Sequence, residues 1–165
     1  MQSVDAFREK WEERHPGIDT SSMEIVGQLK RAHALLELAL EPLYDGAPVS
    51  ASELDVLLKL RHVEAPMISR QLATTMGRSG AAVSKALAKL ERRGLVAREP
   101  NPADRRAAFV QLTDAGMSIV DTVFPKQLSV EAALVRTDQE RRAKIVEGLA
   151  LLVETLEKSQ VDSGH

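Results

Sequence analysis

The sequence predicts a mainly α-helical protein that carries one small β-hairpin. Three observations support this fold class: apolar residues recur at helical spacing, two short helices meet at a tight turn near Gly77, and two strand-like segments joined by a polar turn follow them. Two helices that meet at a tight turn and precede a hairpin form a winged helix-turn-helix, which is an arrangement that reads DNA.

The two helices of this module are defined by signals at their ends. Pro66 suits the first position of the first helix, and Gly77 ends that helix. Ser79 can cap the second helix, which ends at Gly94. The second helix has an apolar stripe of Val83, Leu87 and Leu90 and a polar face with Ser84, Lys85 and Lys89.

The hairpin and the local charge support the same interpretation. Strands are expected at residues 95–98 and 107–112, with a polar turn at 101–106 between them. Residues 66–106 contain nine basic and three acidic side chains (net +6), whereas the rest of the chain contains thirteen and twenty-one (net −8). Because phosphate contacts supply much of the affinity for a duplex, a positive module in an acidic chain favours DNA binding. Arg92 and Arg93 are individually assigned to a solvated helix face.

Three capping boxes predict where further helices begin. Each pairs a Ser or Thr with a Glu three residues later: Ser21 with Glu24, Ser50 with Glu53, and Thr137 with Glu140. The first of these helices should run to about Pro42, and the last should fray from Ser159. Thr113 can cap another helix, which Pro125 should kink or break near Phe124.

The outer helices, at 21–42 and 114–158, carry more apolar surface than one small core needs. We therefore expect them to form a helical dimerisation layer in a homodimer. The chain should form one domain overall, with an N-terminal helix and first dimerisation helix at 1–49, the winged helix-turn-helix at 50–113, and C-terminal dimerisation helices at 114–165.

Composition excludes several other classes. No apolar run is long enough to span a membrane, and no basic-then-apolar leader occurs. The absence of cysteine fits a reducing cytoplasm, and the four histidines are too scattered for a metal site. No nucleophile, base and orienting residue occur in a recognisable set, so we do not expect an enzyme or a bound cofactor.

Trp11 and Asp55 each have a simple structural interpretation. Residues 3–14 predict a short amphipathic helix in which Trp11 packs against the main body. Asp55 can form a surface ion pair with Lys59, four residues later, which would stabilise its helix by only a few tenths of a kcal/mol, roughly.

The order of the helices and the hairpin resembles the MarR family of transcriptional regulators over nearly the whole chain. Its most specific feature here is an Asp-x-Arg wing signature, Asp104 and Arg106, followed by Leu112-Thr113. The resemblance implies that Arg106 enters the minor groove and that Asp104 orients it. It also implies that Ser79, Gly80, Ser84 and Lys85 face the major groove or its phosphates. We add Lys89 and Arg105 to the expected DNA-binding residues because they carry charge on the same module.

A narrower resemblance concerns an effector. The N-terminal helix with its single tryptophan is similar to the urate-responsive branch of that family, and three of the four binding positions of that branch match Trp11, Asp55 and Arg98. The fourth, an arginine, aligns with Ala86. An aromatic plane, a carboxylate and a guanidinium can hold a flat polar molecule, so we expect a urate-like or other organic anion as effector.

The sequence thus predicts a double-stranded DNA-binding transcriptional regulator, a repressor released from a palindromic operator by a small ligand. The alternative is a winged-helix protein without ligand control, such as a nucleoid protein or a protein-binding module. Binding with little preference between a palindrome and random DNA would favour the alternative.

Overall fold

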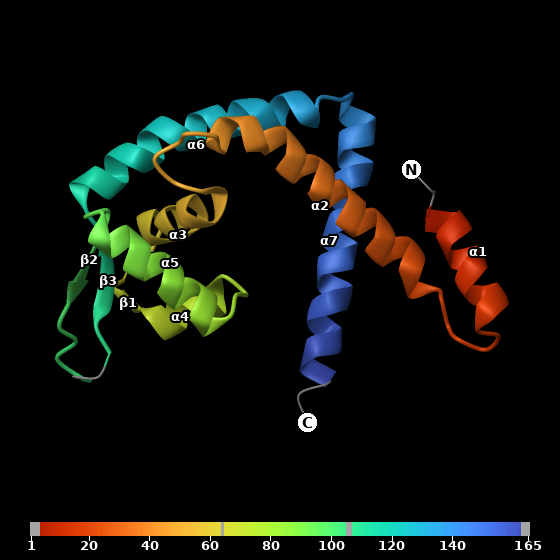
Figure 1. Ribbon diagram of the computed structural model, residues 1–165, viewed down its shortest axis with the longest axis horizontal. Helices are drawn as coiled ribbons and strands as arrows, with labels where there is room; N and C mark the ends of the chain where they lie inside the picture. The colour runs from red at the N-terminus through yellow and green to blue at the C-terminus, as the bar shows by residue number, and fades with distance from the viewer. Residues whose placement is uncertain (1–3, 64, 105–106, 163–165) are drawn as a thin grey trace. The chain divides into compact units, whose positions relative to one another are not determined.

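The computed structural model describes residues 4–63, 65–104 and 107–162, and the chain divides into two compact units, Met1–Glu131 and Ala132–His165. The helices are α1 (Val4–Arg14), α2 (Ser22–Tyr44), α3 (Ala51–Arg61), α4 (Ser69–Thr75), α5 (Gly80–Arg92), α6 (Asp114–Leu134) and α7 (Gln139–Asp162), as drawn in Figure 1. The strands are β1 (Met67–Ile68), β2 (Val96–Glu99) and β3 (Phe109–Leu112). A mainly helical chain with a small antiparallel sheet confirms the predicted fold class. Within the described residues, no helix is both long and apolar enough to cross a membrane.

The core of the winged module lies where α3, α4 and α5 meet the sheet. The stripe predicted for the second helix of the module is buried: Val83, Leu87 and Leu90 expose no more than 1% of their surface. Leu54 and Leu57 of α3 and further residues of α4 and the strands complete the same apolar cluster. Burying each such leucine stabilises the fold by roughly 1.5–3 kcal/mol, so packing fixes which face of α5 points outward.

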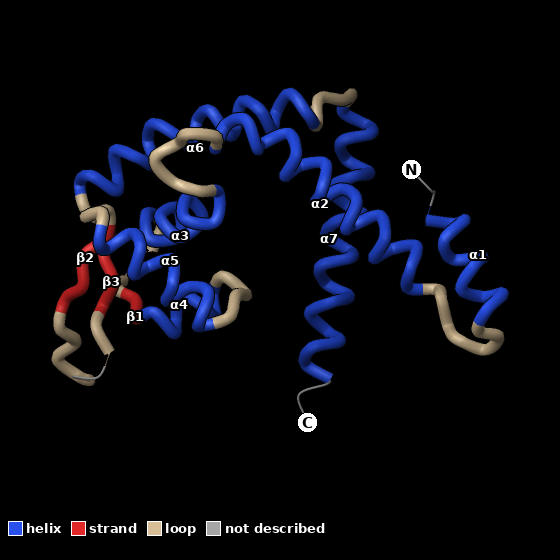
Figure 2. The backbone as a smooth tube through the Cα atoms, viewed as in Figure 1, coloured by secondary structure: helices blue, strands red, loops and turns tan. Residues whose placement is uncertain are grey.

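The sheet has one strand more than the sequence predicted. Its order is β1-β3-β2, with β3 in the centre and antiparallel to both neighbours (Figure 2). Met67 pairs with Val110 and Ile68 with Phe109, so the helix start expected at Pro66 is wrong. The helix begins at Ser69 instead, because Gln71 accepts the Ile68 N–H through its Oε1 at 3.0 Å.

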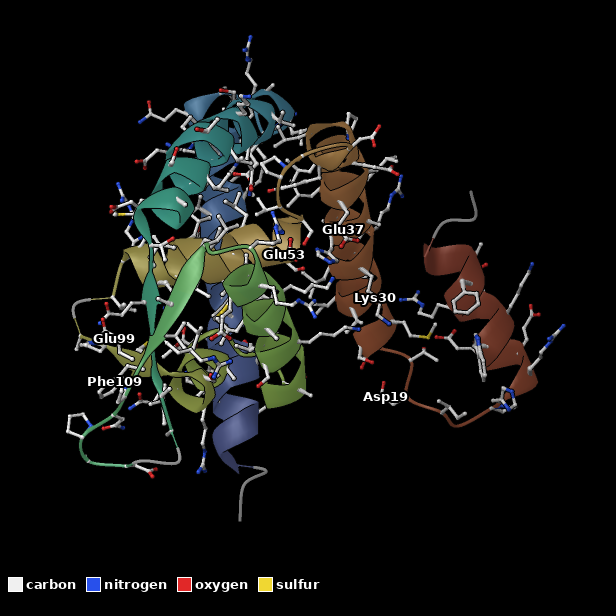
Figure 3. The ribbon with its side chains drawn as sticks, turned by 60° about the vertical axis from the view of Figure 1, so that its left-hand side comes forward. Asp19, Lys30, Glu37, Glu53, Glu99 and Phe109 are labelled. Carbon is white, nitrogen blue, oxygen red and sulfur yellow. The ribbon has the colours of Figure 1, made fainter. Side chains whose placement is uncertain are left out.

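The hairpin is shifted slightly from its predicted bounds. Leu95 is buried and donates its N–H to the carbonyl of Leu90, so it belongs to the connection out of α5 rather than to β2. Gly94 makes this connection possible, because its φ of +67° is a conformation that side-chain-bearing residues rarely adopt. Glu99 and Phe109 lie opposite each other at the far end of the strand pair (Figure 3).

Of the three predicted capping boxes, the second is confirmed. The Ser50 hydroxyl accepts the Glu53 N–H at 3.3 Å, and the Glu53 carboxylate accepts the Ser50 N–H at 3.0 Å. The capping box therefore satisfies two of the backbone N–H groups at the start of α3.

The first and third capping boxes are wrong, for the same reason. Ser21 has helical backbone angles and no side-chain cap, and its N–H is bound by the Asp19 carboxylate at 2.9 Å. A hydrogen bond from the Ser21 side chain, and to a smaller extent this backbone bond, lower the pKa of Asp19. At the start of α7 the cap is Asp138, whose Oδ1 accepts the Arg141 N–H at 2.8 Å, rather than Thr137. In both places an Asp near the expected Ser or Thr makes the bond to the helix start.

The helices on either side of the module are longer than predicted. Thr113 does cap α6, because its hydroxyl oxygen accepts the Gly116 N–H at 3.1 Å. The break expected at Pro125 is wrong: Pro125 lies inside a helix that continues to Leu134. The fraying expected from Ser159 is wrong as well, since α7 continues to Asp162.

Most of the exposed large apolar side chains lie on two helices, one in each compact unit. On α2 they are Ile25, Val26, Leu29, Leu35, Leu36 and Leu38, and on α7 they are Ile145, Val146, Leu149, Leu151, Val153 and Leu156. Side chains on α2 labelled in Figure 3, Lys30 and Glu37, share this exposed helix with them. Such an amount of apolar surface on two helices is unusual for a chain that works alone.

Candidate DNA-binding surface and effector residues

The N-terminus of α5 is built to face an anion. Gly77, with φ of +60°, makes the tight turn out of α4, and Ser79 caps α5 by accepting the Ala82 N–H at 3.2 Å. Ser79 and Gly80 are both exposed at this end of the helix. Backbone N–H groups and the positive end of the helix dipole converge there, which suits a phosphate oxygen.

The outward face of α5 carries the polar residues that the sequence placed there. Ser84, Lys85 and Lys89 are exposed, on the side of α5 opposite its buried stripe. A hollow of 370 Å³ between α4 and α5 is lined by Ser84 and Gly80 together with Arg70 and Arg78. Sequence reasoning did not select these two arginines as DNA-facing residues. The available signal was their charge at the edges of a turn that Gly77 and Ser79 already defined.

The wing is the loop between β2 and β3. Asn101 begins its turn by accepting the Ala103 N–H with its side chain at 3.0 Å and the Asp104 N–H with its backbone carbonyl. Asp104 is exposed, and its carbonyl accepts the Ala107 N–H at 3.1 Å. Arg105 and Arg106 lie outside the described residues.

Two ion pairs from α3 hold the two ends of α5. Asp55 pairs with Arg78, the residue before the cap of α5, at 2.5 Å. Glu53 pairs with Arg93, the residue that ends α5, at 3.2 Å. The partner of Asp55 is therefore not Lys59, and Arg93 is not simply solvated, as the sequence had suggested.

Each of the three expected effector residues contacts a different set of residues in the structure. Trp11 on α1, 42% exposed, stacks on His15 with ring centres 4.7 Å apart, and α1 packs against α2. Arg98 on β2 pairs with Glu91 at 2.9 Å. Asp55 lines a hollow of 320 Å³ together with Lys59, Met76 and Arg78, but not with Trp11 or Arg98.

Tyr44, which sequence reasoning missed, lies in the electrostatic environment of Asp55. Its hydroxyl donates to Gln127 at 2.5 Å, and the Gln127 amide donates to Glu131 at 2.6 Å. Burial raises the pKa of Tyr44, and the negative charges of Asp55 and Glu131 raise it further. The only signal in the sequence was that Tyr44 is the single tyrosine.

The winged module matches a known family. Residues 47–107 match the family model described as MarR family. The PecS transcriptional regulator of Dickeya dadantii is 28% identical to the chain over 130 residues, which is 78% of each protein. Over residues 47–107 the chain belongs to the MarR family. It is a DNA-binding transcriptional regulator rather than an enzyme, and the resemblance seen in the sequence is confirmed.

Solved structures support the MarR fold. Sco3205, a MarR family regulator from Streptomyces coelicolor solved in complex with DNA, is 25% identical, with a TM-score of 0.73 over 86% of this chain and 92% of that one. BpsR from Bordetella bronchiseptica, whose DNA binding is regulated by 6-hydroxynicotinic acid, is 22% identical, with a TM-score of 0.70 over 79% and 98%. Within the described residues of this MarR-family chain, no group of three or more acidic, His or Cys side chains could hold a metal ion.

Proposed function

We propose that this MarR-family regulator is a homodimeric repressor that a small organic anion releases from a palindromic operator. The observation that carries the proposal is the recognition helix α5. Its buried stripe fixes its orientation, its capped N-terminus is exposed, and Ser84, Lys85 and Lys89 point away from the core. A helix held in this way can enter a major groove.

The exposed apolar faces of α2 and α7 support a homodimer. Pairing two copies through these helices would remove that surface from water, and a two-fold protein reads a two-fold site. The operator should then be a pseudopalindrome with half-sites about one helical turn apart.

Charge-removal variants test the DNA-binding surface. Arg106→Ala should cost roughly 1–3 kcal/mol of operator binding, because it removes a groove contact. Lys89→Ala should weaken operator and random DNA alike and reduce the salt slope by about one unit, because it removes a phosphate contact. Lys144→Ala, on an exposed pair with Glu140 in α7, is the matched control and should leave both affinities unchanged. Equal operator affinity for Arg106→Ala and the parent would exclude the wing from the interface.

The effector proposal is supported by the position of Asp55 and Arg98 next to the elements that would contact DNA. Asp55 holds Arg78 directly before the recognition helix, and Arg98 lies on the strand that leads into the wing. BpsR is regulated by 6-hydroxynicotinic acid, and the structural neighbour CouR was solved with p-coumaroyl-CoA, so organic anions act on proteins of this fold. Weakening operator binding a hundredfold needs about 2.7 kcal/mol of preference for the DNA-free conformation, which one charge-assisted contact and stacking on Trp11 can supply.

Trp11 fluorescence and operator release test the effector proposal together, with urate and 6-hydroxynicotinate as probes. Trp11 is the only tryptophan, so its quenching reports binding without ambiguity. Asp55→Asn and Arg98→Ala should abolish the response to whichever probe acts. The matched control is Asp121→Asn on α6, which removes a carboxylate that pairs with Arg61. If both effector variants respond like the control, these residues do not form the effector site.

A further inference from the structure

Glu91 places a carboxylate in the last turn of the recognition helix α5, where its surroundings disfavour a negative charge. The negative end of the helix dipole lies there, and Lys89 and Arg92 in the same turn carry the charge that this end favours. A DNA duplex bound at α5 would repel a carboxylate as well. What favours Glu91 is its contact with β2, because its Oε2 atom accepts a hydrogen bond from the Nε atom of Arg98 at 2.9 Å.

The ion pair between Glu91 and Arg98 contributes little to the stability of the fold. The side chain of Glu91 is 41% exposed and that of Arg98 is 36% exposed. Exposed ion pairs are weak, because water screens the two charges and both side chains lose rotamer freedom. Stability alone therefore does not account for this acidic residue in a module whose residues 66–106 carry a net charge of +6.

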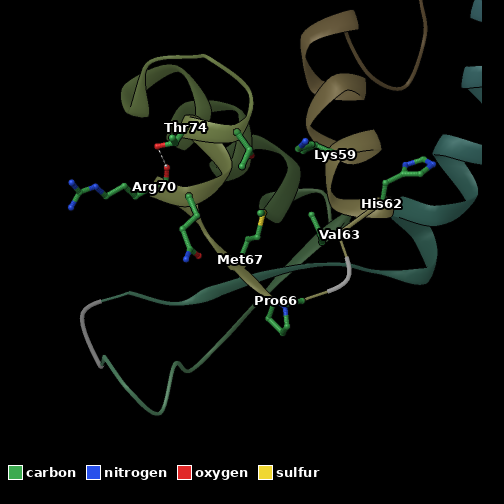
Figure 4. A pocket seen from close by; sticks show the side chains of 10 residues that line it. Lys59, His62, Val63, Pro66, Met67, Arg70 and Thr74 are labelled. Carbon is green, nitrogen blue, oxygen red and sulfur yellow. Dashed lines mark hydrogen bonds between the residues drawn. The ribbon is translucent and has the colours of Figure 1, made fainter. Parts of the chain in front are cut away.

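The pair lies where the apolar packing of β2 ends. Val96 is 3% exposed, and Arg98, two residues later, is on the same face of the strand, because alternate residues of a strand share a face. β2 is an edge strand of the sheet, whereas β3 is flanked on its other side by β1, whose Met67 is labelled in Figure 4. Val96 therefore anchors β2 by packing in the core, and Arg98 extends the attachment to α5 toward the wing by its ion pair.

We infer that Glu91 is a positioning residue for DNA binding, which holds the wing at a fixed angle to the recognition helix by binding Arg98. Placing the wing before DNA arrives lowers the conformational entropy that is lost when the helix and the wing enter their grooves together. Glu91 acts through Arg98 and does not itself contact DNA. The inference rests on the proposed contact of the wing with DNA and does not depend on an effector.

A double-mutant cycle of the full-length protein, without effector, tests this inference with two labelled duplexes. One is a duplex that the parent protein selects from a randomised library, and the other has random sequence and equal length. The measured quantity is the ratio of the two affinities, because the loss of a charge changes both affinities alike and cancels. Glu91→Gln and Arg98→Gln should each lower this ratio about three- to fivefold, which is the largest effect that an exposed pair permits. The double variant should lower the ratio no further than either single variant does.

Asp121→Asn is the matched control, because it breaks another exposed ion pair between two elements, that of α6 with Arg61 of α3 at 3.1 Å. Its affinity ratio should equal that of the parent. Exchanging the two charges, by Glu91→Arg together with Arg98→Glu, should recover most of the ratio, which a loss unrelated to pairing would not do. All of these variants should melt close to the temperature of the parent, since both pairs are exposed.

An unchanged ratio for Glu91→Gln, or losses that add in the double variant, would overturn the inference. A coupling that appears in the melting temperature but not in the ratio would assign the pair a structural role only, and would overturn it as well. Arg106→Ala separates this failure from that of the wing contact. If Arg106→Ala lowers the ratio and Glu91→Gln does not, the wing contacts DNA without needing Glu91, and if neither lowers it, both proposals fail.

Discussion

At the scale of single residues, Glu53 shows how one carboxylate can serve two helices. Its side chain is 9% exposed, and it accepts hydrogen bonds from the Ser50 N–H and from Arg93. The first bond completes the cap of α3, and the second ties α3 to the end of the recognition helix. A buried carboxylate is costly unless it is paired in this way, so both bonds are needed.

Removing that carboxylate should destabilise the fold. Glu53→Ala should lower the free energy of unfolding by about 1–2 kcal/mol, because it removes half of the capping box and leaves Arg93 without its partner. Glu140→Ala, which breaks an exposed pair with Lys144 on α7, should cost only about 0.3–0.5 kcal/mol. Urea unfolding followed by circular dichroism measures the free energy of unfolding of both variants. Equal losses would show that the Glu53 bonds stabilise the fold no more than an exposed ion pair does.

The titration of Tyr44, the single tyrosine, reports on the charge of Asp55. Because the pKa of Tyr44 is raised above its ordinary 10.0, the folded state favours the neutral phenol. The resulting stability is fully present below pH 10 and is lost as the pH rises through the higher folded-state pKa. Asp55→Asn should shift the absorbance titration of Tyr44 to lower pH, since it removes one of the charges that raise this pKa. Asp121→Asn is the control, and identical titrations of the two variants would contradict the coupling.

At the scale of elements, the sequence predicts those helices and strands whose signals lie within one segment of the chain. The helix α5 was predicted because its stripe, from Val83 to Leu90, and its cap Ser79 lie within the same segment. The strand β1 was missed because two residues have no pattern of their own, and Met67 and Ile68 become a strand only through their distant partners on β3.

For the candidate site residues, too, the sequence predicts contacts within one helix better than contacts between two helices. Helical spacing suggested Lys59 as the partner of Asp55, but Arg78 reaches Asp55 across the turn before α5. A pair of this kind depends on how two helices cross, which spacing along one helix does not contain. The family resemblance supplied Trp11, Asp55 and Arg98 as effector residues, and their convergence remains a prediction.

The close approach of α6 to Leu95, in the connection between α5 and β2, depends on a glycine. A Cβ at Gly116 would lie 2.1 Å from the Leu95 carbonyl oxygen, which is backbone and cannot rotate away. Gly116→Ala should therefore lower the melting temperature, at a cost of about 1–3 kcal/mol. Gly148→Ala on α7 is the matched control, because a Cβ there meets nothing within 4 Å, and it should raise stability by about 0.5–1 kcal/mol. Thermal unfolding distinguishes the two, and a neutral Gly116→Ala would mean that α6 can move away from Leu95 at little cost.

At the scale of the whole molecule, the exposed faces of α2 and α7 lead us to expect a homodimer. Sedimentation at micromolar concentration should give twice the mass of the chain. Leu149→Glu and Val153→Glu together should shift the protein to monomer, because two charges would be placed on an exposed apolar face of α7. Gln139→Glu, at the exposed start of the same helix, should leave the dimer intact. A monomeric parent, or a double variant that still dimerises, would contradict a dimer built on α7.

The order of strands in the sheet has a consequence for how the protein is made. The central strand β3 is the last of the three along the chain, so neither β1 nor β2 can find its neighbour until β3 has been synthesised. During translation α3, α4 and α5 leave the ribosome before β3 does, so β1 and β2 still lack the strand with which they pair. The wing therefore closes late in synthesis, and the nascent chain exposes Met67, Ile68 and Val96 in the meantime. Such temporarily unpaired strands are the segments that chaperones protect from aggregation.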